Sequence, residues 1–107
     1  MRNDDPIPLR ALRLQALASP VRLRILQDLK RPRENYPPQV DGDPIADGIC
    51  ADFIKARLGL APATVSRHLR VLTDAGFLIP TRKKGWTFFR RNDDEIARFF
   101  ISLGQDL

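Results

Sequence analysis

Cysteine and histidine are almost absent from this sequence, which has one of each among its 107 residues. A single cysteine excludes an internal disulfide framework and agrees with a reducing compartment. The sequence also lacks a glycine-rich phosphate loop, a serine elbow and a metal triad. Cys50 and His68 lie in different segments, so neither has a visible activating partner. We therefore expect neither an enzyme nor a cofactor.

Long hydrophobic runs are also missing. No apolar run approaches the ~20 residues that are needed to span a bilayer, and no charged-then-apolar signal peptide opens the chain. We expect a cytoplasmic protein with no membrane partner. The hydrophobic content of 43% in 107 residues is enough for one domain with a modest core.

Acidic residues are scarce in one part of the chain. Between residues 55 and 91, Asp74 alone opposes a series of lysines and arginines, whereas most other acids gather near the N-terminus, in residues 34–52 and at residues 93–95. The formal net charge is +5. This distribution favours a polyanionic partner for residues 55–91.

Residues 58–78, LGLAPATVSRHLRVLTDAGFL, predict an amphipathic helix from about residue 62 to residue 75. Val65, Leu69 and Leu72 follow helical spacing and should face inward, with His68 beside them. The opposite side carries short or cationic side chains that can enter a DNA major groove. These outward residues are Ala63, Ser66, Arg67 and Arg70.

Both ends of this helix carry the residues that helix ends favour. Gly59 suits a tight turn with positive φ, Pro62 suits the first helical position, and Gly76 suits the C-terminal cap. Before the turn, Phe53 and the next apolar residues follow helical spacing, which predicts an earlier helix. Helix, short turn and helix over residues 50–76 predict a helix-turn-helix whose second helix reads DNA.

A β-hairpin is predicted directly after these helices, over residues 77–91. Residues 77–80 are extended, residues 82–85 form a cationic turn, and residues 86–89 are rich in strand formers. Pro80 lacks an N–H donor, so its strand lies at a sheet edge or turns that side outward. A helix-turn-helix followed by such a hairpin is a winged helix.

Three blocks carry a resemblance to the ArsR/SmtB family of bacterial winged-helix repressors: ALASPVRLRILQDL at residues 16–29, residues 58–78, and TRKKGWTFFRR at residues 81–91. The resemblance implies a mainly α fold with a small β-hairpin in the order α-α-α-α-β-β-α. It also implies a homodimer that binds a palindromic operator and releases it when a small effector, often a metal ion, binds. Ala61 stands where the family commonly has a serine helix cap.

Outside the helix-turn-helix and wing we predict a flexible arm at residues 1–8, helices near residues 9–18 and 20–29, and a terminal helix at residues 92–107. The first and last helices pair in dimers of the family, and both carry broad apolar stripes. The expected dimer interface consists of Leu9, Leu12, Ala16, Ile96, Phe99, Phe100 and Leu103.

Residues 30–48 contain four prolines and two glycines and predict a loop. The family usually has only a few residues here, and structureless loops of more than about 12–15 residues are uncommon in compact domains. Two interpretations stay open: a mobile surface loop, which we favour, or an effector-binding loop.

Cys50 stands where metal-sensing members of the family carry a Cys-x-Cys pair, and Asp52 replaces the second cysteine. A soft-metal site needs two or three thiolates, and zinc prefers four ligands. We therefore predict no metal site, with Cys50 a small hydrophobic residue. Thiol sensing by Cys50, or a site that it shares with Asp52 across a dimer, is the less favoured alternative.

The sequence thus predicts a sequence-specific transcriptional regulator that binds double-stranded DNA as a homodimer and responds to an unknown effector. Arg67 is the preferred guanine contact, and the wing cations would neutralise phosphates. The predicted DNA-binding set is Ala63, Thr64, Ser66, Arg67, Arg70, Arg82, Lys83, Lys84 and Arg90. The alternative is a winged-helix module that binds a protein and reads no DNA sequence.

Overall fold

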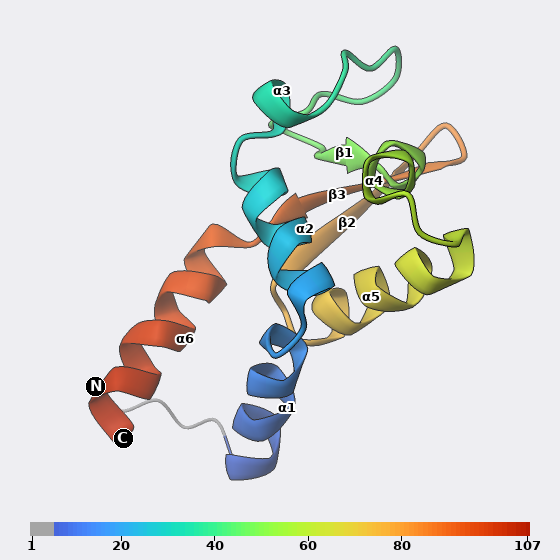
Figure 1. Cartoon of the computed structure of the whole chain (residues 1–107). Helices are drawn as coiled ribbons and strands as arrows, with labels where there is room; N and C mark the ends of the chain where they lie inside the picture. Colours follow the sequence, from blue (N-terminus) through green and yellow to red (C-terminus); the bar gives the residue numbers. More distant parts are fainter. Residues whose placement is uncertain (1–5) are drawn as a thin grey trace.

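A computed structural model of the chain describes residues 6–107 and confirms a mostly helical fold with a small antiparallel hairpin (Figure 1). The first helix begins at Ile7 and so takes the last two positions of the predicted arm, whose first five residues lie outside the described part. The elements follow in the order α1 (Ile7–Leu17), α2 (Pro20–Lys30), α3 (Pro32–Asn35), β1 (Ile49–Cys50), α4 (Ala51–Leu58), α5 (Pro62–Asp74), β2 (Leu78–Lys83), β3 (Trp86–Arg91) and α6 (Asp93–Asp106).

The helix ends follow the residues that predicted them. Gly59 and Gly76 have φ values of +67° and +86°, which end α4 and α5 in the left-handed region. The Ser19 hydroxyl accepts a hydrogen bond from the Arg22 backbone N–H at 3.3 Å and caps α2. Ala61 offers α5 no side-chain cap. Proline at the first turn of α5 compensates in part, because it has no N–H to satisfy.

The sheet has the order β1-β3-β2, and β2 therefore lies at an edge, which agrees with Pro80. Lys84 and Gly85 form the hairpin turn with φ values of 53° and 81°, the signs that a type I′ turn requires. Strand β1 was not predicted. It places Cys50 opposite Phe88 of β3, ahead of α4 rather than within a helix. A two-residue strand is too short to show a sequence period.

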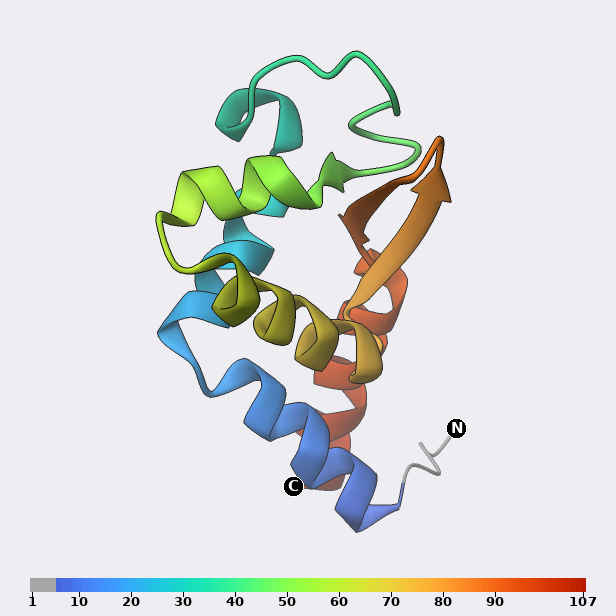
Figure 2. The same ribbon diagram turned by 90° about the vertical axis from the view of Figure 1, so that its right-hand side faces the viewer.

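The main core lies between the helices and the inner face of the sheet. Its fully buried side chains include Ile25, Ile54, Leu72, Phe77 and Phe99. Helices α1 and α6 extend toward the same end of the molecule, away from the hairpin tip (Figures 1 and 2). No helix within residues 6–107 combines the length and apolar character that crossing a membrane requires.

The segment of residues 30–48 was predicted to be a loop, but it carries the short helix α3 and packs against the sheet. Tyr36 is buried, with 6% of its surface exposed. The Gln39 amide accepts a hydrogen bond from the Cys50 backbone N–H at 2.7 Å and donates one to the Gly48 carbonyl at 3.1 Å. Contacts of this kind, between residues 9 and 11 positions apart, follow no helix or strand period in the sequence.

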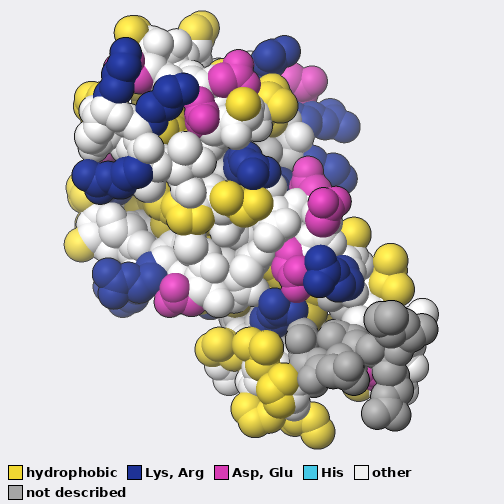
Figure 3. Space-filling view, turned by 180° about the vertical axis from the view of Figure 1, so that it is seen from behind, with side chains coloured by type: hydrophobic (Ala, Val, Ile, Leu, Met, Phe, Trp, Pro, Cys, Tyr) yellow, Lys and Arg dark blue, Asp and Glu magenta, His cyan; other side chains and the backbone are white. Residues whose placement is uncertain are grey.

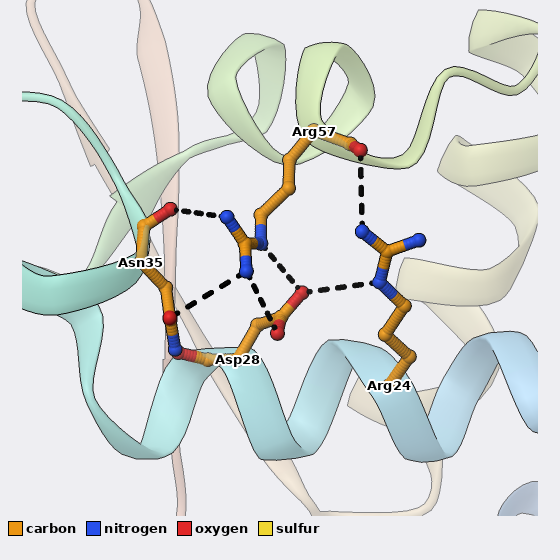
Figure 4. A network of polar contacts seen from close by, with 4 residues as sticks. All are labelled: Arg24, Asp28, Asn35 and Arg57. Atoms are coloured by element: carbon orange, nitrogen blue, oxygen red, sulfur yellow. Dashed lines mark hydrogen bonds and ion pairs between the residues drawn. The ribbon is translucent and has the colours of Figure 1, made fainter.

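A polar network joins α2, α3 and α4 (Figure 4). Arg57 donates from Nε to the Asp28 carboxylate at 2.8 Å and from Nη1 to the Asn35 carbonyl at 2.8 Å, and its guanidinium lies 5.5 Å from the centre of the Tyr36 ring. Burial, and secondarily the charge of Asp28, raises the pKa of Tyr36 to about 12. Arg57 thus holds the first helix of the helix-turn-helix in place.

Candidate nucleic-acid interface

Helix α5 has one buried and one exposed side, as its sequence predicted. Val65 and Leu72 are completely buried and Leu69 is 2% exposed. Thr64 is half-buried at the flank of the helix. The opposite side is open to solvent and, apart from Asp74, carries no acid; its exposed residues include Ala63, Ser66, Arg67 and Arg70. The structure therefore brings four of the predicted DNA-binding residues onto one surface.

An open groove of about 350 Å³ separates α5 from the wing, which comprises β2, β3 and their turn. Ser66 and Arg70 line it from α5, Lys55 from α4, and Thr87 and Phe89 from β3. The lining combines two cations with three hydroxyls and one acid, Asp74. Cations and hydroxyls are the groups that contact a phosphate backbone. Lys55 was not in the predicted set, because its place beside α5 depends on how α4 packs.

The lysines at the wing tip are less available to a partner than the sequence indicated, because carboxylates of the protein pair with them. Arg82, Lys83 and Lys84 are exposed. However, the Lys83 ammonium lies 3.2 Å from the Asp47 carboxylate, and the Lys84 ammonium lies 3.4 Å from the Asp41 carboxylate. The Asp43 backbone N–H and the Lys83 ammonium hold the pKa of Asp47 below its usual value. The segment of residues 30–48 thus neutralises part of the wing.

Arg90 does not join the α5 surface, which corrects one predicted DNA contact. Alternate residues of a strand face opposite sides of the sheet. Thr87 and Phe89 line the groove beside α5, so Arg90 shares the other side with Phe88. Arg90 is also half-buried. Its side of the sheet is the one that residues 39–42 cover.

His68 supports α5 from the inner side. The Arg22 Nη1 group donates to the His68 Nδ1 atom at 3.0 Å, so this histidine is neutral with its proton on Nε2, because arginine cannot accept. Desolvation lowers the pKa of His68, and the charges of Arg22 and Arg67 lower it further. Arg22 also donates to the carbonyls of Ala16 at 2.7 Å and Gln15 at 3.0 Å, and so ties the end of α1 to α5.

The residues around Cys50 do not fit a metal ion. Cys50 is a buried free cysteine, and Asp52 is exposed at the start of α4. Within residues 6–107, no three His, Cys, Asp or Glu side chains come together in an arrangement that could hold a metal. The single thiol therefore lacks the further ligands that thiophilic ions require.

An apolar surface covers the far end of α1 and α6. Leu12 is 49% exposed and Phe100 is 51% exposed, and Leu9, Ile96 and Leu103 are half-buried. Seen from behind, hydrophobic side chains gather at this end of the molecule (Figure 3). Two predicted interface residues are corrected: Ala16 and Phe99 are each 1% exposed and belong to the core of the subunit itself. The apolar stripes of α1 and α6 are wide, so part of each stripe packs in the core and part lies on the surface.

The helix-turn-helix, its basic outer face and the following hairpin define a winged-helix regulator. A family model described as "Bacterial regulatory protein, arsR family" matches residues 54–79. The chain is 31% identical over 84 residues to the uncharacterized HTH-type transcriptional regulator YbzH of Bacillus subtilis (strain 168), covering 78% of this chain and 84% of YbzH. The protein belongs to the ArsR family of DNA-binding transcriptional regulators.

Solved structures agree on the fold. A possible transcriptional regulatory protein (fragment 1–100) from Mycobacterium bovis superposes with a TM-score of 0.67 at 22% identity, covering 99% of this chain and 100% of that chain. A solution structure from the same organism, described as a homodimeric winged helix-turn-helix DNA-binding domain, gives a TM-score of 0.64 at 21% identity, covering 92% of this chain and 77% of that chain.

Proposed function

We propose that this regulator is a homodimeric repressor that reads a specific operator through the outer face of α5. The observation that carries this proposal is the division of α5 into a buried apolar side and an exposed side with Ser66, Arg67 and Arg70. An α-helix of this kind fits the major groove, where each base pair presents a distinct pattern of donors and acceptors. We propose a cytoplasmic location, because the regulator must be in the same compartment as the DNA that it binds.

The roles of the proposed contacts follow from their positions. Arg67 at the centre of the exposed face is the proposed guanine contact, and Ser66 and Thr64 are the proposed hydroxyl contacts beside it, with Ala63 allowing close approach. Arg70, Arg82, Lys83 and Lys84 would bind phosphates, which fixes the register of α5 but carries no sequence information.

A homodimer is the arrangement that the apolar surface of α1 and α6 supports. Surfaces of this kind on small domains mark association sites. A two-fold dimer would place two α5 helices about 34 Å apart, one turn of DNA, and would require a palindromic operator. The Mycobacterium bovis domain with the same fold is described as homodimeric. Release by an effector would make the repressor a switch.

The test compares two single variants on a selected operator and on random DNA. Arg67→Ala should weaken operator binding by roughly 1–3 kcal/mol and relax the preference at one base position in each half-site. Arg82→Ala should weaken both DNAs alike and lower the salt slope by about one unit. The measurement is a fluorescence anisotropy titration at several salt concentrations.

Arg82→Ala is the matched control, because it removes the same charge from an exposed site off α5. Equal losses on operator and random DNA for Arg67→Ala would contradict the assignment of α5 as the reading helix. Failure of the unmodified protein to select any sequence would contradict the function itself and would favour the protein-interaction module.

A further inference from the structure

The segment of residues 37–48 covers the side of the sheet that faces away from α5. Phe88 is buried there, with 2% of its surface exposed, and Cys50 is 8% exposed. Gly42 passes so close to the Phe88 ring that a Cβ atom would lie 2.5 Å from the ring. Its φ of +78° is also a conformation that glycine adopts readily. The segment is thus fitted to this side of the sheet, and Figure 2 shows it beside the hairpin tip.

The fit leaves a pocket of about 190 Å³ between this segment, α4 and the wing. Aromatic side chains form three of its walls: Phe53 from α4, and Trp86 and Phe88 from β3. Val40 lines it from the covering segment, and Asp41 is the nearby acid of the same segment. A cavity of ~150 Å³ lined by apolar side chains is large enough to hold benzene. The pocket therefore has the size for one aromatic ring with a small substituent.

Charge decides which aromatic molecules fit. Asp41 and Asp52 both line the pocket, and Lys84 offsets the charge of Asp41 in part, so an anion would meet a net negative lining. A cation would be attracted both by these groups and by the face of the exposed Trp86 ring. The lining therefore favours neutral and cationic aromatic molecules over anionic ones.

Strand β3 is a wall shared by this pocket and the groove beside α5. Trp86 and Phe88 line the pocket, and Thr87 and Phe89 line the groove on the opposite side of the same strand. Asp41 makes a second connection, because it lines the pocket and pairs with Lys84 at 3.4 Å. A molecule in the pocket would therefore contact both strand β3 and Asp41.

We propose that this pocket is the effector site and that it binds a small neutral or cationic aromatic molecule. The ligand packs between Val40 and the aromatic walls and so stabilises the segment in its closed position. In that position Asp41 and Asp47 pair with Lys84 and Lys83 and compete with DNA phosphates for these ammonium groups. Ligand and DNA therefore oppose each other, and each lowers the affinity of the other by the same factor.

Binding to the pocket is tested without DNA. Trp86 is the only tryptophan of the chain, so the tryptophan emission of the full-length protein reports on this pocket. The probes are toluene, benzylammonium and benzoate, which have similar size and differ in charge. Toluene and benzylammonium should change the emission along a saturating curve, whereas benzoate should not. N-acetyltryptophanamide with the same probes corrects for collisional quenching.

Two pocket variants and one control locate the signal. Phe53→Glu places a charge in the wall and should weaken toluene binding at least about tenfold. Val40→Glu at the exposed rim should weaken toluene binding while strengthening benzylammonium binding. Ile45→Glu is the matched control, because Ile45 is 54% exposed on the same segment and does not line the pocket. Circular dichroism establishes that each variant is folded.

The pocket assignment would be overturned if neither toluene nor benzylammonium changed the tryptophan emission along a saturating curve. Wild-type affinity for toluene in a folded Phe53→Glu protein would also overturn it, and benzoate binding equal to toluene would overturn the charge preference.

The coupling to DNA rests on the proposed function and is tested separately, with operator titrations at saturating toluene. Toluene should weaken operator binding about tenfold, within the usual range for linked sites. Asp41→Asn should bind operator more tightly than the wild type and respond less to toluene, since Lys84 is then free. An unchanged operator affinity with bound toluene would overturn the coupling. Failure to bind any DNA without toluene would instead refute the proposed function and leave the pocket result intact.

Discussion

Arginine serves two different purposes in this protein. Arg67 and Arg70 are exposed on α5 and give the proposed DNA-binding face its positive charge. Arg57 and Arg22 instead hydrogen-bond to groups of the protein itself, and Arg91 donates to the Leu26 carbonyl at 3.1 Å and pairs with a neighbouring carboxylate. The guanidinium group suits both tasks, because it presents several donors in a fixed plane. Residues 55–91 therefore contain more cations than are available to contact DNA.

The lowered pKa of His68 gives the first prediction at this scale. The unfolded chain binds a proton near the ordinary value of 6.5, while the folded chain binds it only at lower pH. Between these two pKa values the unfolded state holds more protons, so the free energy of unfolding decreases as the pH falls below about 6.5. It should level off below the folded pKa. Urea denaturation at a series of pH values measures this slope.

His68→Asn is the control for that titration, because its amide oxygen keeps an acceptor for Arg22 near the Nδ1 position. His68 is the only histidine of the chain, so the variant should lose most of the pH dependence between pH 7.5 and 5. The same slope in the variant and the wild type would contradict the neutral, Arg22-bound state of His68.

At the scale of elements, the short strand β1 connects the helix-turn-helix to the wing. It pairs Ile49 with Phe89 and Cys50 with Phe88, directly before α4 begins. Gly48 makes this pairing possible: its φ is +102°, and a Cβ there would lie 2.2 Å from the Phe89 carbonyl oxygen. The position of α4 relative to the wing thus depends on a residue without a side chain.

Gly48→Ala should therefore destabilise the protein more than a glycine substitution without a clash. Gly59→Ala is the matched comparison, because its φ is +67° and nothing lies within 4 Å of the added atom. It should cost about 1–2 kcal/mol from the backbone conformation alone. Gly48→Ala should cost a further 1–3 kcal/mol, roughly, because the backbone must shift. Urea denaturation of both variants measures the difference, and equal losses would contradict the role of the close approach.

At the scale of the whole molecule, the two ends of the structure have different tasks. The hairpin tip and the covering segment lie toward one end, α5 crosses the middle, and α1 and α6 extend to the other end (Figure 2). Ion pairs join these two helices: Arg10 lies 2.8 Å from Asp106, and Arg13 lies 3.0 Å from Glu95. These ion pairs fix α1 and α6 relative to each other, so their exposed apolar residues form one surface.

Phe100→Glu should separate the proposed dimer. Phe100 is 51% exposed, so the folded subunit loses little, while a charge within an apolar interface is costly. Sedimentation velocity should show a dimer for the wild type and a monomer for Phe100→Glu at the same concentration, with operator binding weakened because the two half-sites act separately. Ile45→Glu, on the distant covering segment, should remain dimeric. A dimeric Phe100→Glu protein would contradict this interface.

Local patterns predicted the elements that have a strong period and clear ends. The apolar spacing of α5, its limits near Pro62 and Gly76, and the edge position of Pro80 all follow from residues within a few positions of each other. The order of the long helices and the hairpin followed in the same way. Helix α3 and strand β1 did not, because elements of four and two residues show no period and form only against neighbours.

The sequence by itself determined the winged-helix architecture and the exposed face of α5, which we propose binds DNA, because helix amphipathicity and turn chemistry act over short distances. Only the tertiary structure decided which cations stay free, since partners such as Asp28 and Arg57 are far apart in the chain. It also decided that residues 37–48 close over Phe88 and form a pocket. Such contacts depend on the packing of distant segments, which no local pattern encodes.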